Sequence, residues 1–83
     1  MALIGMLQNT LTLTLYEQAV IIDLQGPYAS KIASLLGPWK HLPIRLIAEG
    51  PWNREPKVFE IGAMRLALRT KEAACIFIKK GTP

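Results

Sequence analysis

Residues able to catalyse a reaction are few in this sequence and lie far apart along it. The chain has one histidine, His41, one cysteine, Cys75, and two serines, Ser30 and Ser34. A general base needs a partner that orients it and a nucleophile within reach, and a metal site needs several His, Cys or carboxylate ligands. The sequence contains neither a GxSxG motif nor a glycine-rich phosphate loop. We therefore predict that the protein is not an enzyme and uses no metal or cofactor.

Basic residues, in contrast, are concentrated in the last third of the chain. Residues 1–56 contain four Lys or Arg and four Asp or Glu, whereas residues 57–83 contain six and two, so the whole net charge of +4 lies in residues 57–83. The candidate nucleic-acid-binding residues are Arg65, Arg69, Lys71, Lys79 and Lys80. On two paired strands they would form a basic β-ribbon, which can lie along phosphates. The same residues on an outer sheet face would also protect it against aggregation.

This charge pattern predicts a small, basic, non-enzymatic protein with nucleic-acid-binding or regulatory function. Two GPW motifs favour an alternative, the binding of a protein partner. They place Trp39 and Trp52 beside prolines, with Arg54 close behind the second motif. Tryptophan and arginine are enriched at the centres of interfaces, and free sheet edges can pair with a partner chain. The alternative is thus an inhibitor or accessory factor, of the kind that phages and plasmids encode. Trp39 is expected to pack on the core, and Trp52 to be the stronger contact.

The alternation of apolar and polar residues predicts an α+β fold, a small antiparallel sheet of about five strands with one short helix, in the order β-β-α-β-β-β. Strands are expected at residues 10–15, 19–25, 42–50, 64–69 and 74–80, and the helix at 28–36. The Gly-Pro pairs begin the helix, end it and close the third strand, so they act mainly as structural breakers.

Two hairpins should connect these strands, one around Glu17-Gln18 and one near residues 70–72. The second hairpin carries the basic ribbon. Helix propensity alone leaves residues 59–73 open between helix and strand, because the stretch AMRLALRTKEAA is rich in helix formers.

Length and composition indicate a single domain, residues 1–83, in which 51% of the residues are hydrophobic. So short an apolar chain is expected to leave apolar surface, which a homodimer would cover. The lone Cys75 forms no internal disulfide and reads as a core residue. The N-terminus lacks the basic start of a signal peptide, and no apolar stretch reaches the ~18 residues of a membrane span. A cytoplasmic location without membrane contact is expected.

Residues 42–80 loosely resemble the swapped-hairpin DNA-binding domains of the AbrB type, in the segments LPIRLIAEGPW and IGAMRLALRTKEAACIFIKK. The resemblance implies a dimeric DNA-binding protein. The sequence departs from that pattern in two places: Ala63 follows Gly62 where the family has an acidic residue, and the last hairpin turn has no glycine.

Overall fold

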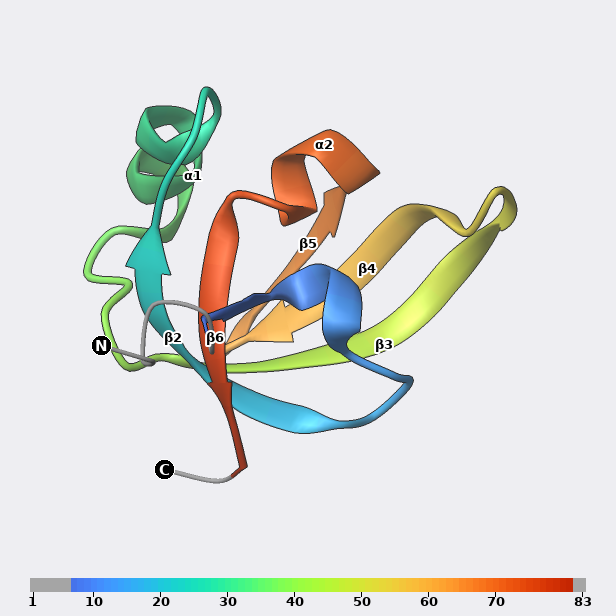
Figure 1. Cartoon of the computed structure of the whole chain (residues 1–83), viewed down its shortest axis with the longest axis horizontal. Coiled ribbons are helices and arrows are strands. Elements are labelled where there is room, and N and C mark those ends of the chain that lie inside the picture. Colours follow the sequence, from blue (N-terminus) through green and yellow to red (C-terminus); the bar gives the residue numbers. More distant parts are fainter. Residues whose placement is uncertain (1–6, 82–83) are drawn as a thin grey trace.

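Residues 7–81 are described by a computed structural model in which six antiparallel strands build one sheet (Figure 1). The strands lie in the order β1-β6-β2-β3-β4-β5. The elements are β1 (Gln8–Asn9), the 3-10 helix η2 (Thr10–Thr12), β2 (Gln18–Leu24), α1 (Ala29–Leu36), β3 (Pro43–Trp52), β4 (Glu55–Ile61), β5 (Met64–Leu68), α2 (Thr70–Ala73) and β6 (Ile76–Lys80). The α+β prediction is confirmed in its antiparallel sheet and short helix, but the strand count is six, not five.

The middle of the chain folds as its sequence predicts. Helix α1 buries Ile32 and Leu36 on one face, and Gly37, at φ 68°, ends it by donating its N–H to the Ala33 carbonyl at 3.0 Å. Strands β2 and β3 form at the predicted positions and pair with each other. Their buried residues alternate with more exposed ones, which is the pattern of a sheet with one face on the core.

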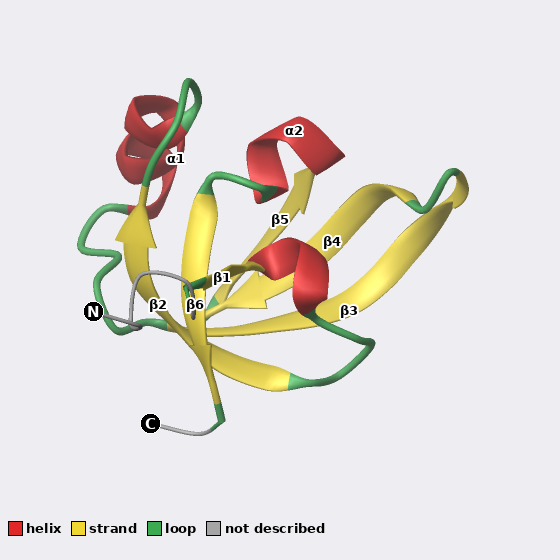
Figure 2. Ribbon diagram, viewed as in Figure 1, coloured by secondary structure: helices red, strands yellow, loops and turns green. Residues whose placement is uncertain are grey.

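Residues 10–15 are not the predicted strand, and the hairpin at Glu17-Gln18 does not form. The Asn9 side chain accepts the N–H of Leu11 at 2.9 Å, and the Thr12 hydroxyl donates to the Asn9 carbonyl at 3.0 Å. Such local side-chain bonds compete with strand pairing and favour a turn or a short helix. Thr10 is buried and donates its hydroxyl to the Ala73 carbonyl at 2.6 Å, so η2 packs against α2 (Figure 2).

The last third also pairs differently from the prediction. Strand β4 begins at Glu55, inside the predicted loop, and it pairs with β3 on one side and β5 on the other. Strand β6 pairs with β1 and β2, and the four residues of α2 replace the expected turn. Strands β5 and β6 are therefore not neighbours, and the predicted hairpin is wrong.

One apolar core joins the sheet to α1. Among the described residues its largest fully buried apolar side chains are Ile21, Ile32, Ile44, Leu46, Phe59, Ile61 and Ile76, from β2, α1, β3, β4 and β6. Cys75 is buried among them with a free thiol. Tyr28 and Trp39 are partly buried and pack against this core, so the expected packing of Trp39 is confirmed.

The segment 50–56 is the tip of a long hairpin that projects beyond the rest of the sheet (Figure 1). Its turn residues Asn53 and Arg54 both have positive φ, 53° and 61°, as a two-residue turn between right-twisted strands requires. Gly50 is needed for a different reason. A Cβ atom on Gly50 would stand 1.9 Å from the Glu55 carbonyl oxygen, so only glycine lets the two strands approach this closely.

Replacing Gly50 by Ala should therefore destabilise the fold by about 3 kcal/mol, because the clash is with backbone and cannot be relieved by a side-chain rotation. Trp52→Ala is the control from the same hairpin. Its side chain is 77% exposed, so its loss should change the free energy of unfolding by less than about 0.5 kcal/mol. Urea denaturation measures both, and equal stabilities of the two variants would contradict the close-approach argument.

Candidate partner-binding surface

The five cations of the predicted ribbon do not share one surface. Arg65 lies on β5 opposite Glu60 of β4, whereas Lys79 and Lys80 lie on β6 opposite Val20 and Ala19 of β2. Strand β6 runs from α2 to the other end of the molecule (Figure 1). Lys79 and Lys80 are therefore separated from Arg69 and Lys71, which lie at α2. The predicted ribbon is wrong because β5 and β6 do not pair with each other. Strand β5 lies beside β4, and β6 lies beside β2.

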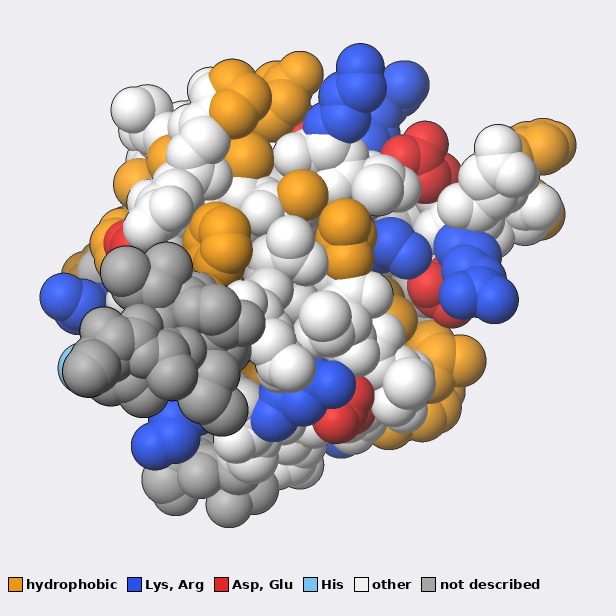
Figure 3. All heavy atoms as spheres, viewed as in Figure 1, with side chains coloured by type: hydrophobic (Ala, Val, Ile, Leu, Met, Phe, Trp, Pro, Cys, Tyr) orange, Lys and Arg blue, Asp and Glu red, His pale blue; other side chains and the backbone are white. Residues whose placement is uncertain are grey.

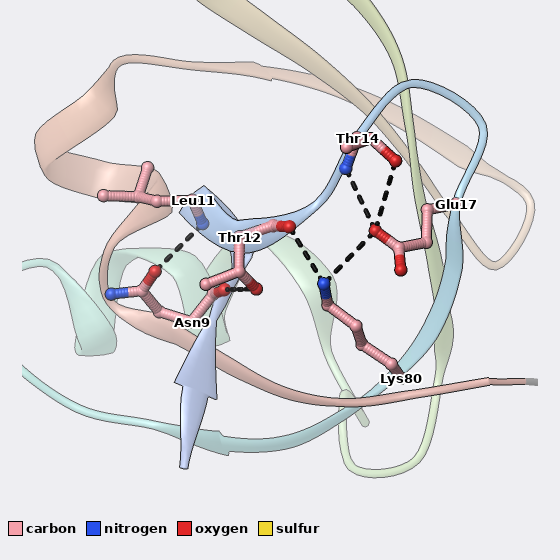
Figure 4. A network of polar contacts seen from close by, with 6 residues as sticks. All are labelled: Asn9, Leu11, Thr12, Thr14, Glu17 and Lys80. Atoms are coloured by element: carbon pink, nitrogen blue, oxygen red, sulfur yellow. Dashed lines mark hydrogen bonds and ion pairs between the residues drawn. The ribbon is translucent and has the colours of Figure 1, made fainter. Parts of the chain in front are cut away.

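Lys80 has a structural role in this arrangement. Its ammonium donates to the Thr12 carbonyl at 3.0 Å and lies 3.3 Å from the Glu17 carboxylate (Figure 4). The same carboxylate oxygen accepts from the backbone N–H and the hydroxyl of Thr14. The bond from the Thr14 N–H is the main cause of the lowered pKa of Glu17, with Lys80 contributing. Lys80 thus holds the segment between η2 and β2 in place.

Arg69 and Lys71 line a hollow of about 220 Å³ beside α2, which we name the α2 hollow. Its other lining residues are Tyr28 at the start of α1, Glu55 at the start of β4 and Glu72 in α2. Figure 3 shows Lys and Arg side chains gathered on this side of the molecule, with acidic side chains next to them. Three segments that are distant in the sequence therefore meet at one polar depression.

Both carboxylates of the α2 hollow hold the fold together. Glu55 accepts the Thr70 N–H at 2.7 Å, which ties the hairpin to α2. Hydrogen bonding from the Thr70 side chain, followed by that from its N–H, lowers the pKa of Glu55. Glu72 accepts the Arg69 N–H at 3.0 Å through one oxygen and forms an ion pair with Lys31 of α1 at 2.8 Å through the other. The bond from Lys31, followed by that from Arg69, lowers the pKa of Glu72. The cations Arg69 and Lys71 form no ion pair within residues 7–81.

Trp52 lies on the projecting hairpin, opposite Glu55, which lines this hollow. It pairs with Glu55 across the turn, and directly opposed residues of an antiparallel pair share a face. The Trp52 side chain therefore leaves the hairpin on the face that carries Glu55. It is 77% exposed, in contrast to Trp39, and Arg54 is exposed beside it. Of the predicted contacts, the structure brings Trp52 and Arg54 together at the tip and leaves Trp39 against the core.

Sequence reasoning missed three residues of the α2 hollow, namely Tyr28, Glu55 and Glu72. The only local signal was the spacing of Glu72 three residues after Arg69, which is that of a capping box, but Arg69 is not one of the usual capping residues. Glu55 comes to α2 through tertiary pairing alone.

Two further hollows lie on other parts of the surface. One, of about 270 Å³, lies over β2, β3 and β4 and includes the ion pair of Arg45 with Glu60 at 2.6 Å. The other, of about 350 Å³, is mainly apolar and lies between Leu36, Leu42 and Met64. Within residues 7–81 no three His, Cys, Asp or Glu side chains come close enough together to hold a metal ion. No helix in that range is long and apolar enough to cross a membrane.

The strand order and the helical turn between β5 and β6 define a small SH3-like fold. Solved structures of FeoA proteins share it. An iron uptake regulatory protein (FeoA) matches with a TM-score of 0.73 and 14% identity, over 90% of this chain and 99% of the other. FeoA of Stenotrophomonas maltophilia, solved with zinc, matches with a TM-score of 0.72 and 29% identity, over 87% of this chain and 89% of the other.

The second protein is described as a prokaryotic SH3 domain protein suggested to be an activating factor of bacterial ferrous iron transport. Neither description is that of an enzyme. No family model matches the chain, and neither does any curated protein. All six strands pair within one chain, so the swapped hairpin that the AbrB-like segments implied is not found in residues 7–81.

Glu72 generates a pH-dependent prediction. Its pKa is lowered in the folded state, so its contribution to stability is complete above the unfolded value of about 4.3 and is lost as the pH falls through the lower folded value. Glu72→Gln should reduce the free energy of unfolding by about 1 kcal/mol at pH 7 and by much less at pH 3. Lys31→Gln removes only the ion pair and should cost less. A Glu72→Gln deficit that is the same at both pH values would contradict this role.

Proposed function

We propose that this protein is a non-enzymatic accessory factor of ferrous iron transport that acts by binding a protein partner. The observation that carries the proposal is the 29% identity, over 87% of the chain, to an FeoA protein suggested to be an activating factor of that transport. The prediction of a regulatory or accessory protein is consistent with this similarity. The binding surface that we assign is the α2 hollow together with the hairpin tip.

The hairpin tip supports binding because Trp52 is presented by a stiff element. Gly50 allows the close strand crossing, and two prolines, Pro51 and Pro56, restrict the backbone on either side of the turn. A preordered backbone loses little conformational freedom when a partner covers the side chain that it carries, so more of the contact energy becomes affinity. An exposed tryptophan on such a support is the residue type that dominates interface energetics.

Deleting the gene in the organism that encodes this protein should lower the uptake of radiolabelled ferrous iron several-fold. A plasmid copy of the wild-type gene should restore the uptake. A Trp52→Ala copy, expressed at the same level, should not, because the side chain it removes is a partner contact and contributes little to the fold. Unchanged uptake in the deletion strain would refute the role in iron transport.

Nucleic-acid binding and the homodimer stay predictions, and so does the cytoplasmic location. A gel-shift series with single- and double-stranded oligonucleotides separates the two classes of partner. The proposed binding of a protein partner predicts no nucleic-acid binding at ~150 mM salt, where the screening length is about 8 Å. A nucleic-acid-binding protein would instead show an affinity for the oligonucleotides that falls steeply as the salt concentration rises. For it, Arg65→Gln, Arg69→Gln and Lys71→Gln together would reduce the salt slope by about two to three units.

A further inference from the structure

The charged groups of the α2 hollow differ in what they are free to bind. Its two carboxylates accept bonds from Thr70, Arg69 and Lys31, as described above. The guanidinium of Arg69 and the ammonium of Lys71 donate no side-chain hydrogen bond to any residue between 7 and 81, and both residues are exposed. With Lys31 the local formal charge is three cations against two anions, a net +1. The groups of the hollow that remain available to a ligand are therefore positively charged hydrogen-bond donors.

The arrangement suits a carboxylate better than a polyphosphate. Arginine offers a planar fork of N–H donors that matches a carboxylate, and lysine adds a second charge. A nucleic-acid backbone or an anionic membrane needs a long run of cations, whereas this hollow has two free ones, with Lys79 on a distant part of β6. Aromatic side chains complete the surface, since Tyr28 lines the hollow and Trp52 leaves the hairpin on the same face as Glu55.

We infer that the α2 hollow recognises an acidic segment of the partner protein, with Asp or Glu side chains bound by Arg69 and Lys71 and a neighbouring apolar side chain packed on Trp52. This inference rests on the proposed function in one respect, that the partner is a protein. It adds the chemistry by which that partner is recognised. Because carboxylate pairing at an exposed site is weakened by salt, the affinity should fall as ionic strength rises.

A phage-displayed library of random peptides tests this directly. The bait is the full chain as wild type, as the Arg69→Gln/Lys71→Gln variant, or as the Arg65→Gln/Lys79→Gln control, which removes two other exposed cations from elsewhere on the surface. Peptides selected by the wild type and by the control should be enriched in Asp and Glu. Peptides selected by the Arg69→Gln/Lys71→Gln variant, called the hollow variant below, should not be enriched in Asp and Glu. A selected acidic peptide, measured by fluorescence titration, should bind the hollow variant about tenfold or more weakly.

Several results would overturn the inference. These are selection of neutral or basic peptides, no selection at all, equal loss of binding in the control, or stronger binding of anionic vesicles or oligonucleotides than of any acidic peptide. Thermal unfolding of each bait checks its fold, and Arg69→Lys/Lys71→Arg, which keeps both charges, should retain the selection of acidic peptides. If that variant selects like the Gln variant, loss of charge is not the cause and the inference fails.

The iron-uptake assay separates this inference from the proposed function. If uptake requires the gene and Trp52 but is fully restored by the Arg69→Gln/Lys71→Gln copy, the proposed function holds and the acidic recognition is wrong. If acidic peptides bind the hollow while deletion of the gene leaves uptake unchanged, the recognition holds and the role in iron transport is wrong.

Discussion

The hydrogen bond from the buried Thr10 hydroxyl to the Ala73 carbonyl, 2.6 Å long, joins the first and last parts of the described chain. A helix of four residues such as α2 is not stable alone and takes its position from its contacts. Thr10 holds its end from the side of η2, Glu55 binds its first N–H from the hairpin, and Lys31 reaches Glu72 from α1. The α2 hollow exists only because these three attachments converge on one short turn.

This convergence explains which parts of the fold were predictable. Helix α1 and strands β2 and β3 follow from local periodicity and from Gly37, all of which act within a few residues. Residues 10–15 alternate like a strand, but Asn9 and Thr10 direct their side chains into local and tertiary bonds that the alternation does not reveal. Strand β4 was overlooked because two prolines and a turn precede its apolar residues.

The site was predictable to the extent that charge and residue type are local properties. The sequence indicates Arg69, Lys71 and Trp52 as binding residues; the structure brings Arg69 and Lys71 together at the α2 hollow and places Trp52 opposite Glu55, which also lines it. Their grouping was not predictable, because consecutive strands usually pair and the insertion of α2 sends β5 and β6 to different neighbours. Because β5 and β6 are not neighbours, the predicted basic residues lie at two separate places on the molecule. The α2 hollow therefore has only a few charged residues, with aromatic residues beside them.

The pairing of β1 with β6 has a practical consequence for handling the molecule. Gln8 lies opposite Ile78, and the two strands are antiparallel, so residue 7 and residue 81 lie at the same end of this strand pair, the end away from α2. A fluorophore placed at position 7 or 81 would therefore be attached at the end of this strand pair that is away from the hollow. Such a label reports on partner binding without occupying the face around α2.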